Sequence, residues 1–195
     1  MTLKLFLVSL LAYLLGNISF SLIIGKIFFK KDVRDYGSGN AGATNAIRAF
    51  GAKFGILTFI GDMLKGVCAA LIGKSVAGVD GLYIASIMVI VGHNWPVFMK
   101  FKGGKGVATT IGTMFVALPF ITLICFIIGI SIAYFTRIVS LGSLIGVILT
   151  PLAVLLFVRP FDVKLFLFVI TYTLMCLFKH RGNIKRLIKK EERKL

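Results

Sequence analysis

The stretch that decides the class of fold is LYIASIMVIVGHNWPVFMKFKGGKGVATTIGTMFVAL, which runs from Leu82 to Leu118. Two apolar runs flank a short, basic and Gly-rich segment. Such runs suit a bilayer, where roughly 20 apolar residues make one helical span and a partly re-entrant helix needs somewhat fewer. Backbone groups in lipid must be paired within their own segment, and the strict alternation of a membrane barrel is absent. Both runs are therefore expected to be helices.

The same pattern extends over the whole chain. Its 195 residues are 58% hydrophobic and 15% charged, with a mean hydropathy of +0.97, which is too apolar for one soluble core. We predict an all-α, polytopic integral membrane protein, with one transmembrane domain over residues 1–195 and about seven transmembrane helices. The predicted spans are Thr2–Phe29, Phe54–Ile72, Leu82–Met99, Val107–Leu118, Phe120–Phe135, Leu141–Val158 and Val163–Phe178.

Lysine and arginine are distributed unevenly between the two ends of these spans. Of the 23, 18 lie on the side where the odd-numbered spans end, including Lys26 near the end of the first span, which places that face in the cytoplasm, the N-terminus outside and the C-terminus inside. The basic cytoplasmic tail covers about residues 180–195. This bias and attraction to anionic lipids explain much of the net charge of +16. A nucleic-acid partner is not expected, because the chain has no soluble groove or stacking platform.

Four polar segments carry the chemistry, and pairs of spans separate them, so all four should lie on the cytoplasmic face. They combine glycine amides, hydroxyls and cations with almost no carboxylates, which favours an anion such as phosphate. The isolated cysteines show no metal spacing, so neither a metal nor a cofactor is predicted. The segments are GSGNAGATN from Gly37, FKGGKGVAT from Phe101, TRIVSLGS from Thr136 and HRGNIKR from His180.

The first segment matches G-x-G-x-x-G through Gly37, Gly39 and Gly42, but a dinucleotide site would need a soluble parallel sheet. We favour an anion-binding loop in which glycines let backbone amides converge and Arg48 adds a charge. The alternative is an ordinary polar connection between helices. Further side-chain donors in this segment are Ser38, Asn40, Thr44 and Asn45.

The second segment places Gly103, Gly104, Lys105 and Gly106 immediately before a predicted helix. It is not a Walker loop, because glycine stands where Ser or Thr should follow the lysine. A Gly-rich turn at a helix N-terminus still offers amide donors and the positive end of the helix dipole to a phosphate. The alternative, a lysine that snorkels to the membrane surface, fits Lys105 less well than the lysines before it.

The third and fourth segments add Ser143 after the fifth span, and His180 and Asn183 after the seventh. Each residue taken singly is equally well explained as a helix cap or a lipid headgroup contact. Asp62 and Lys65 lie three residues apart inside the second span, where charge is costly. We prefer a mutually neutralising structural pair to a proton or ion pathway.

Together, GSGNAGATN, GHNWPVFMKFKGGKGVAT, SLGS and HRGNIKRL resemble the bacterial acyl-phosphate-dependent glycerol-3-phosphate acyltransferase family over essentially the whole chain. The resemblance implies a multi-pass enzyme of the bacterial cell (inner or plasma) membrane with its active site facing the cytoplasm. It further implies transfer of a fatty acyl group from acyl phosphate to the 1-hydroxyl of glycerol 3-phosphate. The products would be 1-acylglycerol 3-phosphate, or lysophosphatidic acid, and phosphate, in the first step of phospholipid synthesis.

The resemblance also implies roles for residues of the four segments. Catalytic roles in binding and orienting the substrates fall to Ser38, Arg48, Lys105, Ser143, His180 and Asn183. Substrate-binding roles fall to Gly37, Gly39, Asn40, Gly42, Thr44, Asn45, His93, Gly103 and Gly104. The expected partners are glycerol 3-phosphate, acyl phosphate and membrane lipids, and the oligomeric state stays open.

The absence of carboxylates from the four segments bears on the mechanism. An acyl phosphate is already activated, so the enzyme must orient a hydroxyl, stabilise an oxyanion and hold the leaving phosphate. The base is either His180 or, as we prefer, the phosphate of glycerol 3-phosphate itself. The main alternative function is a membrane transporter or channel for phosphate or organophosphate anions, although few polar residues mark a path to the opposite face.

Overall fold

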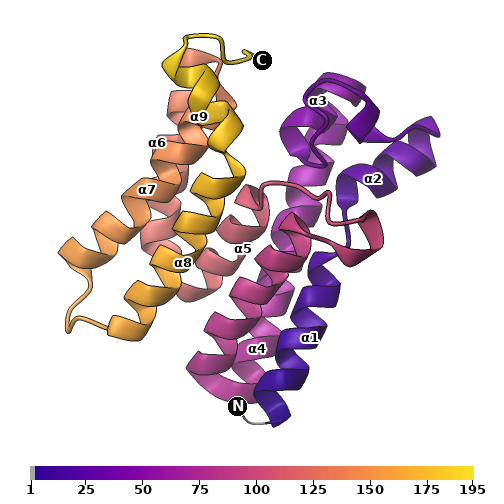
Figure 1. Cartoon of the computed structure of the whole chain (residues 1–195). Helices are drawn as coiled ribbons and strands as arrows, with labels where there is room; N and C mark the ends of the chain where they lie inside the picture. Colours follow the sequence, from indigo (N-terminus) through magenta and orange to yellow (C-terminus); the bar gives the residue numbers. More distant parts are fainter. Residues whose placement is uncertain (1–2) are drawn as a thin grey trace. The chain divides into compact units, whose positions relative to one another are not determined.

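A computed structural model describes residues 3–195, and the described residues form helices without strands. The chain divides into two compact units, residues 1–117 and residues 118–195. Figure 1 shows the helices in sequence order. The first unit contains α1 (Leu3–Gly16), α2 (Phe20–Ile24), the π-helix η1 (Gly25–Phe29), the 3-10 helix η2 (Val33–Asp35), α3 (Ala43–Phe50), α4 (Ala52–Asn94), the 3-10 helix η3 (Val97–Met99) and α5 (Val107–Ala117). The second contains α6 (Pro119–Thr136), α7 (Val139–Phe157), α8 (Val163–Lys179) and α9 (Arg181–Ile188).

The apolar run at the N-terminus is interrupted rather than continuous. Helix α1 ends at Gly16 and α2 begins at Phe20, with buried Asn17 and Ser19 between them. The carbonyl groups of Gly16, at the end of α1, and of Ile18, in the connection to α2, lack helical partners. Both of these carbonyls accept hydrogen bonds from Lys65 of α4. The break therefore provides acceptors for a charged side chain inside the unit.

Helix α4 is continuous by residue range but folds back on itself. The backbone is non-helical at Ala77 and Gly78, and Gly78 adopts a positive φ of 61°, which glycine tolerates. Gly73 and Gly81, on either side of this turn, lie backbone to backbone, so that a Cβ on one would collide with the carbonyl of the other. The two halves of α4 correspond to the two predicted spans Phe54–Ile72 and Leu82–Met99.

Small residues bring the helices of the first unit close together. Gly16 of α1 lies against Gly92 of α4, and a Cβ on either residue would clash with the backbone of the facing helix. Gly66 of α4 approaches the Thr109 carbonyl of α5 in the same way. Glycine at helix contacts permits such close backbone approach in membrane proteins. This packing fixes the segment after α4 relative to the α1 terminus.

The second unit uses the same device. A Cβ on Gly142 of α7 would collide with the Gly129 carbonyl of α6, so glycine at this position permits close helix packing. The Thr173 hydroxyl of α8 donates to the Val147 carbonyl of α7 at 3.5 Å and to the Val169 carbonyl at 2.9 Å. Helices α8 and α9 meet at His180 with a bend of 63°.

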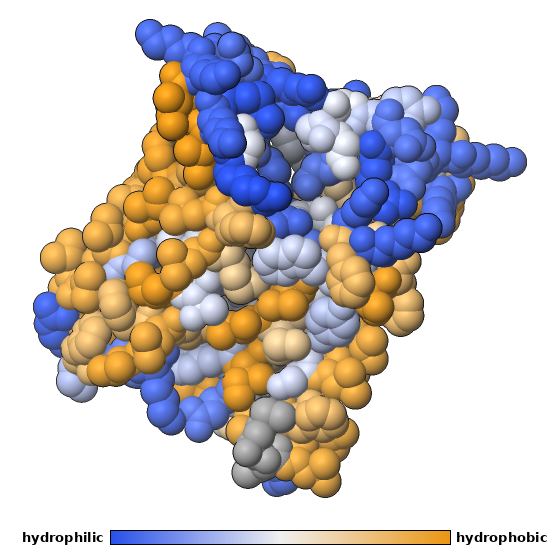
Figure 2. Space-filling view, in the orientation of Figure 1, coloured by the Kyte–Doolittle hydropathy of each residue, from blue (hydrophilic) through white to orange (hydrophobic). Residues whose placement is uncertain are grey.

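All seven predicted apolar stretches overlap helices, but length and composition support fewer full spans. Among the described residues, four helical segments are long and apolar enough to cross a membrane, and a fifth is added if the bent pair α8–α9 counts as one. Helix α4 with its fold-back counts once, and α5 is shorter. Figure 2 shows hydrophilic residues over α9 and the C-terminal segment of the second unit, and around α3 in the first. The flanks of α1 and α4 are mainly apolar in this view.

Candidate functional site

The first Gly-rich segment is a loop that Asn45 fixes through hydrogen bonds of its side chain. Asn45 lies in the first turn of α3 and is buried. Its Oδ1 accepts from the Ser38 backbone N–H at 2.8 Å and from the Ser38 hydroxyl at 3.1 Å. Its Nδ2 donates to the carbonyls of Val33 and Tyr36 at 2.8 and 2.9 Å. An asparagine amide has two donors and two acceptor positions, so all four serve the loop.

Gly37 and Gly39 bend this loop with φ angles of 57° and 71°. A Cβ on Gly37 would strike the Asn45 Oδ1, so glycine is needed there for space as well as for its backbone conformation. The same Cβ position lies 3.6 Å from the Arg48 Cβ, which brings the predicted cation beside the loop. Ser38 is exposed, whereas Asn40, Gly42, Thr44 and Arg48 are half-buried.

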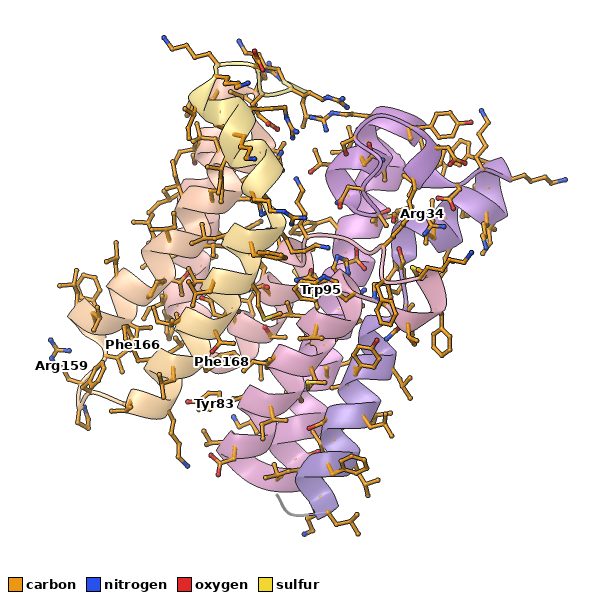
Figure 3. The ribbon with its side chains drawn as sticks, viewed as in Figure 1. Arg34, Tyr83, Trp95, Arg159, Phe166 and Phe168 are labelled. Atoms are coloured by element: carbon orange, nitrogen blue, oxygen red, sulfur yellow. The ribbon has the colours of Figure 1, made fainter. Side chains whose placement is uncertain are left out.

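Just before the first segment, Arg34 forms an ion pair with Asp32 at the N-terminus of η2. Figure 3 labels Arg34, whose Nη2 lies 2.7 Å from Asp32 Oδ2. The Arg34 backbone N–H also donates to Asp32 Oδ1 at 2.8 Å. These hydrogen bonds favour the carboxylate and lower the pKa of Asp32. The contact anchors the start of the loop without placing a carboxylate in it.

The second Gly-rich segment packs against His93 and Asn94, the last residues of α4. The Gly104 N–H donates to the His93 carbonyl at 3.0 Å. A Cβ on Gly103 would collide with the same carbonyl, and a Cβ on Gly106 would lie 2.7 Å from the Asn94 Oδ1. Gly106 has a φ of 81° and immediately precedes α5. Lys105 is half-buried between these glycines.

Gly104 joins the two Gly-rich segments of the first unit. A Cβ built on Gly104 would strike the His93 Nε2 and would lie 2.8 Å from the Ala41 carbonyl oxygen. Ala41 belongs to GSGNAGATN, and His93 precedes FKGGKGVAT. The first unit thus brings the predicted residues Gly104 and His93 together, and Gly104 lies against the backbone of Ala41, which was not a predicted site residue. Trp95, labelled in Figure 3, follows α4, and its carbonyl accepts from the Tyr13 hydroxyl at 3.0 Å.

His93 is the end of a buried polar network. Asp62 Oδ1 lies 2.8 Å from Lys65 Nζ, which confirms the predicted pairing of these residues. Lys65 Nζ also lies 2.8 Å from the His93 Nδ1, and Asp62 Oδ1 lies 3.6 Å from the same nitrogen. All three side chains are at most 5% exposed. Sequence reasoning identified the pair but missed its link to the histidine.

In the second unit, His180 is buried where α8 meets α9. Its Nδ1 lies 2.9 Å from the Cys176 carbonyl oxygen and 3.4 Å from the Cys176 Sγ. A carbonyl oxygen only accepts, so Nδ1 carries the proton, and Nε2 is the basic nitrogen of a neutral ring. This tautomer suits a residue that takes a proton at Nε2.

Asn183 is held by a carboxylate that sequence reasoning overlooked. Its Nδ2 donates to Glu192 Oε1 at 2.6 Å, and Arg186 Nε donates to Glu192 Oε2 at 2.8 Å. Burial by itself raises the pKa of Glu192, but hydrogen bonds from Asn183 and Arg186 outweigh it and lower the pKa. The available signal was a pair of acidic residues, Glu191 and Glu192, in an otherwise basic tail.

Ser143 lies on α7, and its hydroxyl donates to the Val139 carbonyl at 2.9 Å, as serine often does within a helix. Thus Ser143, His180 and Asn183 each have a defined place in the second unit. Within residues 3–195, no group of three or more His, Cys, Asp or Glu side chains is arranged to hold a metal ion.

Comparison with known proteins gives one consistent answer. A family model described as glycerol-3-phosphate acyltransferase matches residues 6–190. The glycerol-3-phosphate acyltransferase of Thermoanaerobacter pseudethanolicus is 44% identical over 189 residues, which cover 97% of this chain and 94% of the relative. That of Clostridioides difficile is 44% identical over 194 residues, covering 96% of this chain and 94% of the relative.

Two crystal structures of PlsY (YgiH), an integral membrane glycerol 3-phosphate acyltransferase, also match. The glycerol 3-phosphate form has a TM-score of 0.90 at 39% identity and covers 98% of this chain and 95% of that chain. The lysophosphatidic acid form has a TM-score of 0.88 at 38% identity with the same coverage. The match extends over nearly the full length in sequence and in fold, and this chain belongs to the glycerol-3-phosphate acyltransferase family.

Proposed function

We propose that this protein transfers a fatty acyl group from acyl phosphate to the 1-hydroxyl of glycerol 3-phosphate. The products are 1-acylglycerol 3-phosphate and inorganic phosphate. The observation that carries the proposal is the contact of the two Gly-rich segments at Gly104, beside Lys105 and the start of α5. Membership of the family supports the same acceptor, and the chemistry of the polar segments supports an acyl phosphate as donor.

Phosphate binding is assigned to the Gly-rich segments. Backbone N–H groups at the start of α5, with the positive end of its dipole, favour an anion, and Lys105 adds a point charge there. Ser38 and Arg48 contribute a hydroxyl and a guanidinium from the first loop. Asn40, Thr44 and the glycines complete the donor set, and Asn45 supports it by fixing the loop.

The reaction needs little beyond these groups. The 1-hydroxyl oxygen of glycerol 3-phosphate attacks the acyl carbon, the bond from that carbon to the phosphate oxygen breaks, and phosphate departs. Hydrogen-bond donors and cations stabilise the oxyanion that develops on the acyl oxygen and the charge on the leaving phosphate. We propose catalytic roles for Arg48 and Lys105 of the first unit and for Ser143 and Asn183 of the second unit.

The proton of the attacking hydroxyl has two candidate acceptors. A phosphate monoester has a second pKa of about 6, which suits it to take a proton at neutral pH. The His180 Nε2 is the rival acceptor, and the hydrogen bond that holds Nδ1 to the Cys176 carbonyl supplies the required tautomer. We favour the substrate phosphate, with the His180 Nε2 as a hydrogen-bond acceptor that orients the substrates.

The choice of base is testable with His180→Ala. Under the substrate-assisted mechanism, kcat at saturating substrates falls by no more than about 10²-fold, because the obligate base is still present. A fall of several orders of magnitude in kcat, with the protein still folded in detergent, would identify His180 as the base.

Product identification by mass spectrometry, with palmitoyl phosphate as donor, tests the acceptor position on glycerol 3-phosphate.

We further propose a membrane arrangement for this activity. The chain forms one transmembrane domain of about seven spans in the bacterial cell membrane, with the N-terminus outside and the polar segments facing the cytoplasm. The fold-back of α4 supports counting that helix as two spans, and the short α5 suits a partial crossing. Anion transport is the competing function, and it predicts phosphate flux across liposomes without acyl transfer.

A further inference from the structure

We propose that Asp62, Lys65 and His93 form a buried positioning network that fixes Gly104 between the two Gly-rich segments and so sets the geometry of the phosphate site. The inference rests on the proposed function. The resemblance implies a substrate-binding role for His93, and the role proposed here replaces it, because none of the three side chains is proposed to touch substrate. Their effect on catalysis passes through the backbone of the glycine turn.

The network begins with an ammonium group whose protons all find acceptors. Asp62 Oδ1, 2.8 Å from Lys65 Nζ, is an ion-pair partner that makes no hydrogen bond within residues 3–195. Lys65 Nζ therefore has one proton each for the Gly16 carbonyl at 3.1 Å, the Ile18 carbonyl and the His93 Nδ1. It carries no lone pair when paired with the carboxylate, so the His93 Nδ1 at 2.8 Å must be the acceptor of that contact. The proton of the neutral imidazole then sits on Nε2, and one tautomer of His93 is fixed.

The other end of the network is the glycine turn. The His93 ring touches Gly104 through Nε2, and the His93 carbonyl accepts the Gly104 N–H at 3.0 Å. Gly104 in turn lies against the Ala41 carbonyl of the first loop. A rotation of the His93 ring would move its Nε2 edge relative to this contact. The orientation that Lys65 imposes on the ring is therefore transmitted to both Gly-rich segments.

A pair retained for packing alone would not need this third member. Buried charges in a membrane helix are costly, and apolar residues of similar volume would fill the same space at lower cost. Asp62 and Lys65 neutralise each other one turn apart on α4, which accounts for their pairing but not for the contact from Lys65 to His93. That contact is accounted for if the pair orients the histidine that supports Gly104.

Two variants separate positioning from stability. His93→Asn keeps an acceptor near the Nδ1 position, so Lys65 stays satisfied, but it removes the ring edge that reaches Gly104. Asp62→Leu combined with Lys65→Met removes both charges together, which avoids leaving one buried charge unpaired. The matched control is Ser86→Ala. Ser86 is fully buried on the same helix, and its hydroxyl has no hydrogen-bond partner within residues 3–195.

We expect His93→Asn to unfold within a few degrees of wild type in detergent, and the double variant to unfold at a lower temperature, because the Gly16 and Ile18 carbonyls lose their donor, but to be folded under assay conditions. Both should raise the KM for glycerol 3-phosphate about tenfold or more, because the loops bind its phosphate, and Ser86→Ala should leave KM and kcat unchanged. Folded His93→Asn with kcat and KM within about twofold of wild type would overturn the proposal. If His93→Asn does not fold, the same criterion applies to the double variant.

A second measurement, of thermal stability with and without ligand, tests the network independently of acyl transfer. Glycerol 3-phosphate should raise the thermal transition of wild type and of Ser86→Ala, and this shift should be lost in both network variants. If the wild-type protein shows no acyl transfer, the proposed function is refuted, but the ligand-induced shifts of wild type and variants can still be compared. Equal ligand-induced shifts in wild type and folded network variants would refute the positioning role.

Discussion

At the residue scale, we expect catalytic activity to be most sensitive to added side-chain volume at Gly104. A Cβ there would meet the His93 Nε2 and the Ala41 carbonyl, so the two Gly-rich segments would have to separate. Gly104 is buried and donates its N–H to the His93 carbonyl, which leaves the turn little freedom to shift. We therefore expect Gly104 to be required for close approach rather than for an unusual backbone angle.

The matching prediction compares Gly104→Ala with Gly182→Ala. Gly104→Ala should lower kcat/KM for glycerol 3-phosphate by about 10²-fold, because a displacement of about 1 Å in a site can cost that much. Gly182→Ala lies in α9, where the added Cβ meets only the Arg186 Nη1 at 3.6 Å. It should keep near-normal kinetics in the same acyl-transfer assay. Gly104→Ala with unimpaired kinetics would contradict this account of the turn.

Residues with local partners were predictable, and residues with distant partners were not. Asp62 and Lys65 are one helical turn apart, so their pairing follows from the sequence. The contact between Lys65 and His93 joins residues 28 apart in sequence and depends on how α4 folds back. Asn45 was predicted as a substrate donor, but its amide makes two hydrogen bonds to Ser38 in the loop and two to the Val33 and Tyr36 carbonyls before it, which no sequence pattern reveals.

At the element scale, α9 and the segment after it are joined by Glu192. The lowered pKa of Glu192 means that the carboxylate is bound more tightly when ionised, so its contribution is present at neutral pH. The contribution is lost as pH falls below the ordinary glutamate range and through the lowered value of the folded state. Protonation removes the charge that Arg186 and Asn183 hold.

We predict that Glu192→Gln loosens the C-terminal segment at neutral pH and removes this part of the acid dependence. Hydrogen exchange of residues 181–195, followed from pH 7 to pH 3, measures it. The control is Glu191→Gln at the exposed neighbour, which should behave like wild type. Identical exchange profiles for wild type and Glu192→Gln would show that the contact does not hold the segment. Because the tail is mostly basic, the sequence did not indicate that Glu192 holds this segment.

The helices themselves were the most predictable elements, because each apolar stretch must pair its backbone internally. Their interruptions were less predictable. The break between α1 and α2 lies inside one predicted span. It requires two polar residues, Asn17 and Ser19, to be buried between the helices. The fold-back of α4 was expected as a boundary between two spans, and Gly78 with its positive φ accounts for its position.

At the scale of the whole molecule, the distribution of lysine and arginine predicts which ends face the cytoplasm. In a background without Cys68, Cys125 and Cys176, we expect Lys189→Cys to react with an impermeant maleimide only after the cells are permeabilised. Lys74→Cys and Arg159→Cys, on exposed positions, should react in intact spheroplasts. Reaction at Lys189→Cys without permeabilisation would reverse the proposed orientation.

The central claim is an acyl transfer that uses the Gly-rich segments to hold phosphate. Its most direct measurement is phosphate release by the purified protein from palmitoyl phosphate, with and without glycerol 3-phosphate, repeated with Lys105→Ala and with an acyl-CoA donor. The account predicts one phosphate per lysophosphatidic acid, release that depends on glycerol 3-phosphate, and a loss of about 10²-fold or more in Lys105→Ala. No release with any acyl donor, or full activity in Lys105→Ala, would contradict it.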